Sequence, residues 1–308
     1  MTLNERNNRL KKSAAVASVL LALLLIILKT IAFLKTDSLA VFSSLIDSLT
    51  DLLASAISFA AIYFATKPAS QSHRYGYGKS EALSALLQAV FVAASGVFVI
   101  FDGIKRFIYP VEIMQTSLGI WIMLFSIFAT ALLVSYQAYV AKRTNSLAIK
   151  ADMAHYTVDF LTNSAVVVSL FLIHFFGFVY FDILTALFIS CYLLYSAYIL
   201  AKESIEQITD KELSVDVREQ IKDIVKSSKG IHGMHDFRTR NLGDVFYFEF
   251  HVELNGTISL NKAHELTESV EQKILAFYPN SQILIHQDPL GVRENRLDYT
   301  LDGACKLD

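Results

Sequence analysis

The runs SLIDSLTD at residues 44–51 and ADMAHYTVD at residues 151–159 place ionisable side chains inside two long apolar stretches. Asp47 and Asp51 are four residues apart, as are His155 and Asp159, so on helices each pair shares one face. A carboxylate in hydrocarbon costs at least about 2.5 kcal/mol, so these groups require an explanation. The default explanation is a pathway for an ion.

The amino-acid composition indicates what class of protein carries these four groups. Of 308 residues, 54% are hydrophobic and 18% are charged, and the apolar residues are concentrated before about position 203. Such a chain is too apolar for an ordinary soluble protein and is typical of a polytopic membrane protein with a soluble tail. The formal net charge is -2 and the basic residues form no stripe, so nothing indicates a nucleic-acid partner.

Six mainly apolar runs are each long enough to cross a bilayer as a helix. They are residues 13–35, 38–65, 80–108, 116–141, 147–176 and 179–201. Basic residues cluster in the N-terminal residues 1–12, the 66–79 loop and the 142–150 loop, which would all lie on one side. The positive-inside rule makes that side cytoplasmic. Six spans within a transport domain of residues 13–203 would leave both termini in the cytoplasm.

The region 204–290 is expected to be a small α+β domain with the order α-β-β-α-β. The alternation of apolar and polar residues over 245–254 predicts a strand with one buried face, and the polar face carries His251. Helices are expected over 214–229 and about 260–277, with Gly230 as the stop of the first. The other strands are expected around 235–240 and at 282–286, ending before Pro289. The polar residues 291–308 predict a flexible tail.

The four intramembrane groups suit a transition metal. A single buried aspartate can equally well bond a neighbouring helix. Three carboxylates and one imidazole together can surround Zn²⁺ tetrahedrally, and they tolerate Fe²⁺, Mn²⁺, Co²⁺ or Cd²⁺. A metal ligand must be deprotonated, so protons and metal compete for it. The imidazole of His155, with a reference pKa of about 6.5, is the expected proton exchanger.

The two intramembrane runs, together with His286-Gln287-Asp288-Pro289 in the soluble region, resemble the cation diffusion facilitator family, in particular its bacterial zinc and ferrous-iron efflux members. The resemblance covers residues 10–290. It implies a homodimer of six-span protomers, each with a cytoplasmic metallochaperone-like domain, in a bacterial inner membrane. It also implies export of divalent metal, zinc first and ferrous iron second, against inward protons by alternating access. Asp47, Asp51, His155 and Asp159 match the family's transport ligands.

The resemblance also implies metal sites outside the bilayer. In the cytoplasmic domain, the residues that match the family's binuclear zinc ligands are His235, His251, His264, His286, Gln287 and Asp288. In the 66–79 loop the family's Asp and two His positions are Ser70, His73 and Tyr77, so this loop site is expected to be lost or weak. Lys79 and Asp210 match a charge pair that clamps the dimer; an exposed pair worth about 0–1 kcal/mol is the alternative.

Two polar residues beside the transport ligands have open roles. Asp152 could be a group through which the ion enters or a proton is relayed, but a carboxylate favoured by the helix N-terminus is preferred. Asn163 could donate to the Asp159 carboxylate or bond another helix.

Two functions of other classes remain open from the residues alone. A membrane-anchored sensor would bind metal in its tail without transporting it, and a channel would conduct ions passively. Nothing in the chain has the arrangement of an enzyme's catalytic groups, so no enzymatic activity is expected.

Overall fold

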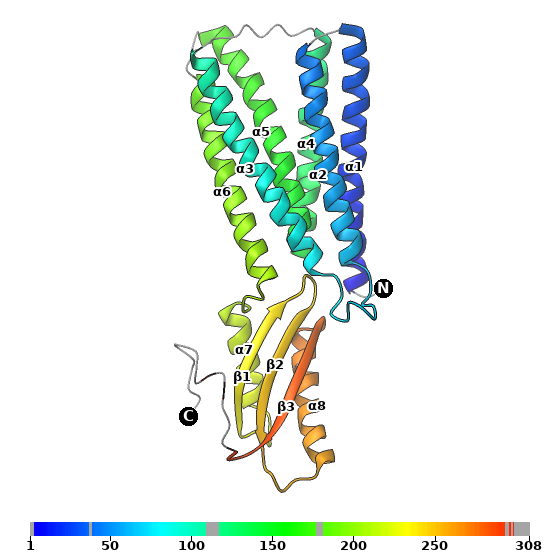
Figure 1. Ribbon diagram of the computed structural model, residues 1–308, viewed down its shortest axis with the longest axis vertical. Helices are drawn as coiled ribbons and strands as arrows, with labels where there is room; N and C mark the ends of the chain where they lie inside the picture. The colour runs from blue at the N-terminus through cyan, green and yellow to red at the C-terminus, as the bar shows by residue number, and fades with distance from the viewer. Residues whose placement is uncertain are drawn as a thin grey trace. The chain divides into compact units, whose positions relative to one another are not determined.

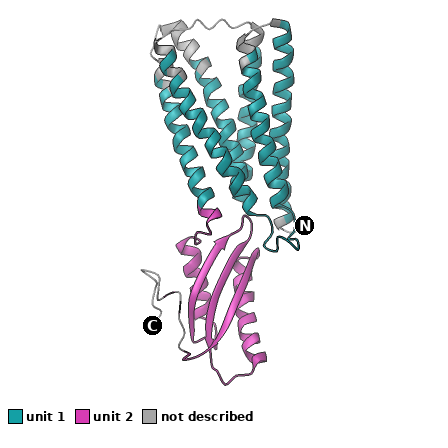
Figure 2. Cartoon of the chain, in the orientation of Figure 1, with its two compact units in different colours: residues 1–205 teal, residues 206–308 magenta. Residues whose placement is uncertain are grey.

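The protein is described here by a computed structural model that covers residues 3–36, 39–108, 117–176, 181–292, 296 and 298. The chain divides into two compact units, residues 1–205 and 206–308, coloured separately in Figure 2. The first unit is helical and the second combines helices with a sheet (Figure 1).

The first unit contains helices where the apolar runs predict them. Their bounds are α1 Leu3–Thr36, α2 Leu39–Ala65, α3 Lys79–Ile108, α4 Ser117–Thr144, α5 Leu147–Phe176 and α6 Phe181–Ile208. At a rise of 1.5 Å per residue, each is long enough for a hydrocarbon core of about 30 Å. Among the described residues, four stretches are long and apolar enough to cross a membrane: Glu5–Lys35, Ser44–Ala65, Lys79–Phe101 and Trp121–Thr144. The six-span count stays a prediction.

Small residues allow these helices to pack closely. Ala14 and Ala15 of α1 and Ala148 of α5 are fully buried beside Ile62 and Ile149. Contacts of this kind are typical of helices in lipid, where association depends on close packing rather than on the hydrophobic effect. Many large apolar side chains point outward instead, including Leu20, Leu53, Phe98, Phe128 and Leu184. The unit therefore has an apolar exterior and polar groups among its helices.

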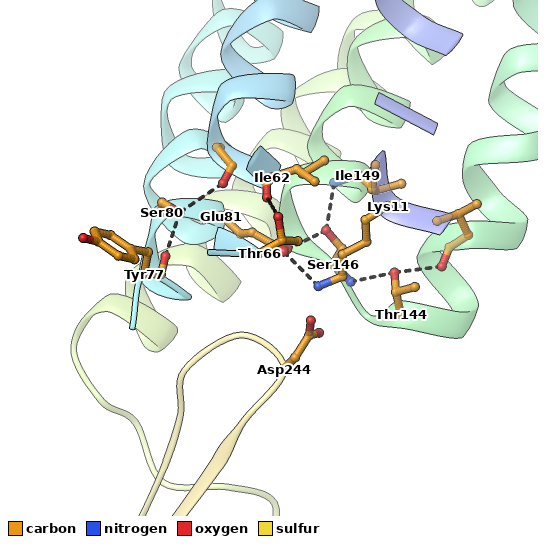
Figure 3. A network of polar contacts seen from close by, with 12 residues as sticks. Lys11, Ile62, Thr66, Tyr77, Ser80, Glu81, Thr144, Ser146, Ile149 and Asp244 are labelled. Carbon is orange, nitrogen blue, oxygen red and sulfur yellow. Dashed lines mark hydrogen bonds and ion pairs between the residues drawn. The ribbon is translucent and has the colours of Figure 1, made fainter. Parts of the chain in front are cut away.

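A buried ion pair joins the N-terminal parts of two of these helices. Lys11 of α1 donates to Glu81 of α3 at 2.8 Å, and the residues are only 1% and 3% exposed. The second carboxylate oxygen of Glu81 accepts from the Ser146 hydroxyl, just before α5, at 2.5 Å. Figure 3 shows this network. Helix α1 begins at Leu3, ten residues before the predicted span, and Lys11 in this added part is buried against α3.

The second unit has the predicted α-β-β-α-β order. Its elements are α7 Val215–Lys226, β1 Gly233–Asn241, β2 Phe246–Leu254, α8 Leu260–Phe277 and β3 Ser281–Pro289. Strand β2 lies in the middle, antiparallel to β1 and parallel to β3. Its alternate residues Phe248, Phe250 and Val252 are fully buried against Ile221 of α7 and Val270 and Ile274 of α8. The other face of β2 therefore remains available for polar groups.

Two expectations for this unit need correction. The prediction that the last strand ends before Pro289 is wrong, because β3 pairs with β2 as far as Leu254 opposite Pro289. Proline is tolerated there because β3 is an edge strand. Two residues of the expected flexible tail are also held: the Asp298 carboxylate accepts from the backbone N–H of Asp236 at 2.8 Å, and Arg296 pairs with Glu253. Most of residues 293–308 lie outside the described residues.

Candidate metal centres

Three of the four predicted transport ligands come together between α2 and α5. One ligand atom from each of Asp51, His155 and Asp159 lies within 4.8 Å of the others. Nε2 of His155 is 3.1 Å from Oδ1 of Asp51, and both residues are buried. The i, i+4 spacing on α5 places His155 and Asp159 on one helix face, as the sequence predicts. The cluster joins two helices inside an apolar bundle.

The Asp159 carboxylate has an unused acceptor. Its Oδ2 atom is buried and has no hydrogen-bond partner among the residues that the structure describes. Buried polar atoms without partners are rare, and an absent ion is one of their explanations. For Asn163 the sequence left open a bond to this carboxylate and a bond to another helix, and both stay predictions. The Asn163 amide donates to the backbone carbonyl of Asp159 at 2.7 Å.

Asp47 lies outside this cluster. It is one turn before Asp51 on α2, and its side chain is exposed on the isolated chain. The structure therefore brings together three of the four predicted ligands. The role of Asp47 as the fourth ligand stays a prediction.

Lys29 is a polar residue near this cluster that was not predicted from the sequence. This residue lies in α1, and its ammonium group donates to the Ser44 carbonyl at 3.0 Å and to the Ser48 hydroxyl at 2.7 Å. Ser48 follows Asp47 directly, so a basic side chain lies beside the predicted transport ligands. A lysine inside the apolar run 13–35 was the available signal, because the cost argument applied to buried carboxylates applies to it as well.

Asp152 is not a carboxylate at a helix N-terminus. Helix α5 begins at Leu147, and Asp152 lies beyond its first turn, with no exposed surface. It accepts hydrogen bonds from the Gln137 amide at 2.7 Å and from the Ser18 hydroxyl at 2.5 Å. The preferred interpretation from sequence is therefore wrong, because neutral groups of other helices surround this carboxylate.

A second cluster forms on the polar face of the cytoplasmic sheet. Ligand atoms of His235, His251 and Asp288 lie within 4.8 Å of one another. The Asp288 carboxylate is 2.8 Å from Nδ1 of His251, 3.5 Å from Nε2 of His235 and 3.2 Å from Nε2 of His286. The rings of His251 and His286 are also in contact, with centroids 4.5 Å apart. Imidazole nitrogens around a carboxylate are a donor set that fits Zn²⁺.

A bulge in β1 aims His235 at this cluster. The register of β1 against β2 shifts between His235 and Arg238, and Asp236 has a φ of 52°. Such a bulge re-aims a side chain next to a functional site. The sequence holds no signal for it, because neither glycine nor proline marks the position.

The other two predicted cytoplasmic ligands lie elsewhere. His264 is exposed on α8 and lies 3.9 Å from Glu268. The Gln287 amide donates to Thr267 at 2.9 Å, because residue 287 points to the opposite face of β3 from His286 and Asp288. Within one chain, the cluster therefore consists of three histidines and one aspartate.

The 66–79 loop is closed by its own groups. The Ser70 hydroxyl is 3.0 Å from the Tyr77 hydroxyl, and the His73 ring stacks on Tyr77 with centroids 4.5 Å apart. The weakness of a metal site here stays a prediction. The predicted pair of Lys79 with Asp210 also stays a prediction; Asp210 lies 4.0 Å from Arg240.

The chain matches two family models that together cover most of its length. Residues 15–209 match the cation efflux transmembrane domain and residues 213–290 match the cation efflux protein, cytoplasmic domain. The chain belongs to the cation efflux family. The resemblance to cation diffusion facilitators is thus confirmed, and so is the division into a helical transmembrane domain and a cytoplasmic metallochaperone-like domain.

Relatives of this cation efflux protein span its length. The cation-efflux pump FieF of Serratia proteamaculans is 38% identical over 284 residues, covering 92% of this chain and 94% of the relative. The FieF pump of Yersinia pestis is 39% identical over 281 residues, covering 91% and 93%. The metal-bound C-terminal domain of the CzcD transporter from Thermotoga maritima is 28% identical, covering 26% of this chain and 94% of that one, with a TM-score of 0.25.

Proposed function

We propose that this cation efflux protein exports divalent metal in exchange for protons, with Zn²⁺ as the first choice of cargo and Fe²⁺ as the second. Cd²⁺, Mn²⁺ and Co²⁺ are further cargoes that the same ligands tolerate. The observation that carries the proposal is the cluster of Asp51, His155 and Asp159 in an apolar helical bundle. Such groups are costly in a membrane unless an ion uses them.

The contacts within the cluster support exchange of metal for protons. Asp51 and His155 bond to each other at 3.1 Å, and a metal would take over the nitrogen and oxygen atoms that form this bond. The unpartnered Oδ2 of Asp159 offers a third ligand atom. Because the imidazole must be deprotonated to bind metal, a proton that arrives at His155 expels the metal.

Alternating access is the second part of the proposal. The ligands come from α2 and α5, so a movement of either helix relative to its neighbours would change which side of the membrane reaches the metal. We place the protein in a bacterial inner membrane with both termini in the cytoplasm, in agreement with the basic residues of the N-terminus and of the 66–79 and 142–150 loops.

The cytoplasmic domain would bind regulatory or structural metal and form a homodimer. His235, His251, His286 and Asp288 supply ligands within one chain. His264 and Gln287 would join such a centre only after a rearrangement or from a second chain. Because metal that binds the folded dimer stabilises it, filling these sites would favour association of the cytoplasmic domains.

Flux measurements with the purified protein in sealed vesicles test the proposal. The variants Asp51→Ala and His155→Ala should abolish uptake of Zn²⁺ and Fe²⁺. The exposed residues Asp216 and His232 provide the matched controls Asp216→Ala and His232→Ala, which should transport normally. Retained transport in both site variants would overturn the site assignment.

The same vesicles separate the two alternatives. A membrane-anchored sensor would bind metal without any flux. A passive channel would take up metal at a rate that is insensitive to an imposed pH gradient, and the internal pH would not change. An antiporter requires both the dependence on the gradient and the movement of protons.

A further inference from the structure

The buried surroundings of Asp152 form a site that the metal chemistry does not use. The carboxylate lies where α1, α2, α4 and α5 meet, four helices that run side by side in Figure 1. Ser18 comes from α1, Ser55 from α2 and Gln137 from α4. These three residues have almost no exposed surface, and Asp152 has none.

The side chains that contact this carboxylate are neutral. Among the described residues, neither a lysine nor an arginine forms an ion pair with Asp152. The titratable groups closest to it are His155 and Tyr156 on its own helix, while α1, α2 and α4 present it with hydroxyl and amide groups. A fully buried carboxylate without a lysine or arginine partner depends on the hydrogen bonds around it to offset its lost hydration.

The hydrogen bonds around Ser55 lack one hydrogen if Asp152 is ionised. The Tyr156 hydroxyl donates to the Ser18 carbonyl at 3.0 Å, and this uses its one hydrogen, because a carbonyl only accepts. The contact of 2.9 Å between the Ser55 and Tyr156 hydroxyls must then use the hydrogen of Ser55. The contact of 3.4 Å between Ser55 and Oδ1 of Asp152 must then share the same hydrogen of Ser55, unless the carboxyl group itself donates.

The same shortage occurs at Ser18. Its hydroxyl lies 3.1 Å from the Ala14 carbonyl and 2.5 Å from Oδ2 of Asp152, and it has one hydrogen for both. The Gln137 amide cannot help, because it already donates to Ser18 at 2.9 Å and to Asp152 at 2.7 Å. A proton on either carboxyl oxygen therefore completes one of the two deficient contacts.

We infer that Asp152 is a proton-binding site of the transport domain, separate from the metal ligands. Its ligand is a proton taken from water, and the proton is stored as the carboxylic acid. Since four helices supply its surroundings, a movement of α5 against α1 and α4 would remove donors and acceptors and change the proton affinity. Proton binding would thus be coupled to the conformation of the bundle. The inference deepens the proposed exchange of metal for protons and rests on that function.

Infrared difference spectroscopy of the full-length protein tests the site without requiring transport. The spectrum of the wild type should contain the C=O stretching band of a protonated carboxyl group that disappears as the pH is raised. This band should be missing in Asp152→Asn and present in the exposed control Asp216→Asn. In Ser55→Ala, which removes one acceptor for the proton, the band should shift in frequency. A spectrum of Asp152→Asn that keeps the same titrating band would overturn the inference.

Proton counting in vesicles adds the functional readout. With the metal ligands intact, Asp152→Asn should move fewer protons per metal ion than the wild type, whereas a merely structural role would lower the rate and leave this ratio unchanged. If the wild type moves no protons but the infrared band is present, the proposed antiport fails and the proton site stands. If the wild type couples protons and Asp152→Asn keeps both the band and the ratio, the site fails and the antiport stands.

Discussion

The ion pair between Lys11 and Glu81 provides a sharp test of how this helical bundle is held together. Both charged groups are buried, and both oxygens of the carboxylate are used, one by Lys11 at 2.8 Å and the other by Ser146 at 2.5 Å. Removal of one member leaves an opposite charge in a space without water. We therefore expect Lys11→Met to lower the free energy of unfolding by about 3–5 kcal/mol.

A second single variant and a double variant should cost less than Lys11→Met. Ser146→Ala leaves the ion pair in place and removes one hydrogen bond, so the loss should be about 1–3 kcal/mol. The double variant Lys11→Met with Glu81→Met buries apolar groups of similar volume, and such replacements are often neutral or stabilising. The coupling energy between positions 11 and 81 should accordingly be at least about 2 kcal/mol.

The measurement is unfolding of the purified protein in mixed detergent micelles, in a double-mutant cycle. Lys12→Met is the matched control, because Lys12 is the next residue on α1 and is exposed. The reasoning is refuted if the coupling energy is below about 0.5 kcal/mol, the range of exposed pairs, or if Lys12→Met destabilises the protein as much as Lys11→Met does.

Three further predictions concern the metal centres and the cytoplasmic domain. Asp288→Ala should weaken metal binding to the cytoplasmic domain of the full-length protein about tenfold to a hundredfold, measured by calorimetry, because three imidazoles lie around this carboxylate. His264→Ala should have little effect on the metal affinity of a single chain. Equal losses of affinity in the two variants would contradict the cluster as described. Metal affinity of the transport site should fall as the pH is lowered, roughly tenfold per pH unit where one proton competes for one ligand, and a flat profile in equilibrium binding would argue against this. Gly230→Ala should destabilise the cytoplasmic domain more than Gly291→Ala does. Both glycines have a φ of 85°, but only a Cβ at position 230 would lie 3.0 Å from a side-chain atom of Leu266. Equal decreases in the temperature of thermal unfolding would show that this close contact does not affect stability.

Local periodicity was sufficient for the elements of this fold. Helix α8 has the predicted bounds, residues 260–277, because the helical pattern of apolar residues extends over the whole helix. The first helix begins at Leu3, before the predicted span of residues 13–35, because a hydropathy pattern follows apolar residues and cannot show that a charged residue such as Lys11 is buried against another helix.

The predictions for some site residues were wrong because these residues contact parts of the chain that are distant in the sequence. Asp152 was interpreted from its own helix alone, but Ser18, which defines its surroundings, is 134 residues away in the sequence. His264 was grouped with the other histidines by resemblance, but its side chain lies on the exposed face of α8 and is not part of the cluster within one chain. Spacing on one helix predicted the pair His155 and Asp159, because such a pair requires no knowledge of how other helices pack.

The buried polar groups of the helical unit can be ordered by how completely their bonding is satisfied, and this order matches the roles that we assign. Glu81 has a full set of partners of opposite charge or hydrogen-bonding type, as expected of a group that only holds helices together. Asp152 lacks one hydrogen, the deficit that a bound proton removes. Asp159 has a carboxylate oxygen without any partner within the described part of the chain, the deficit that a cation removes. A bundle built only for stability would have no reason to retain the second and third kinds of deficit, since each costs free energy that packing must offset. Their retention on the same helix, α5, supports the exchange of metal ions for protons that we propose.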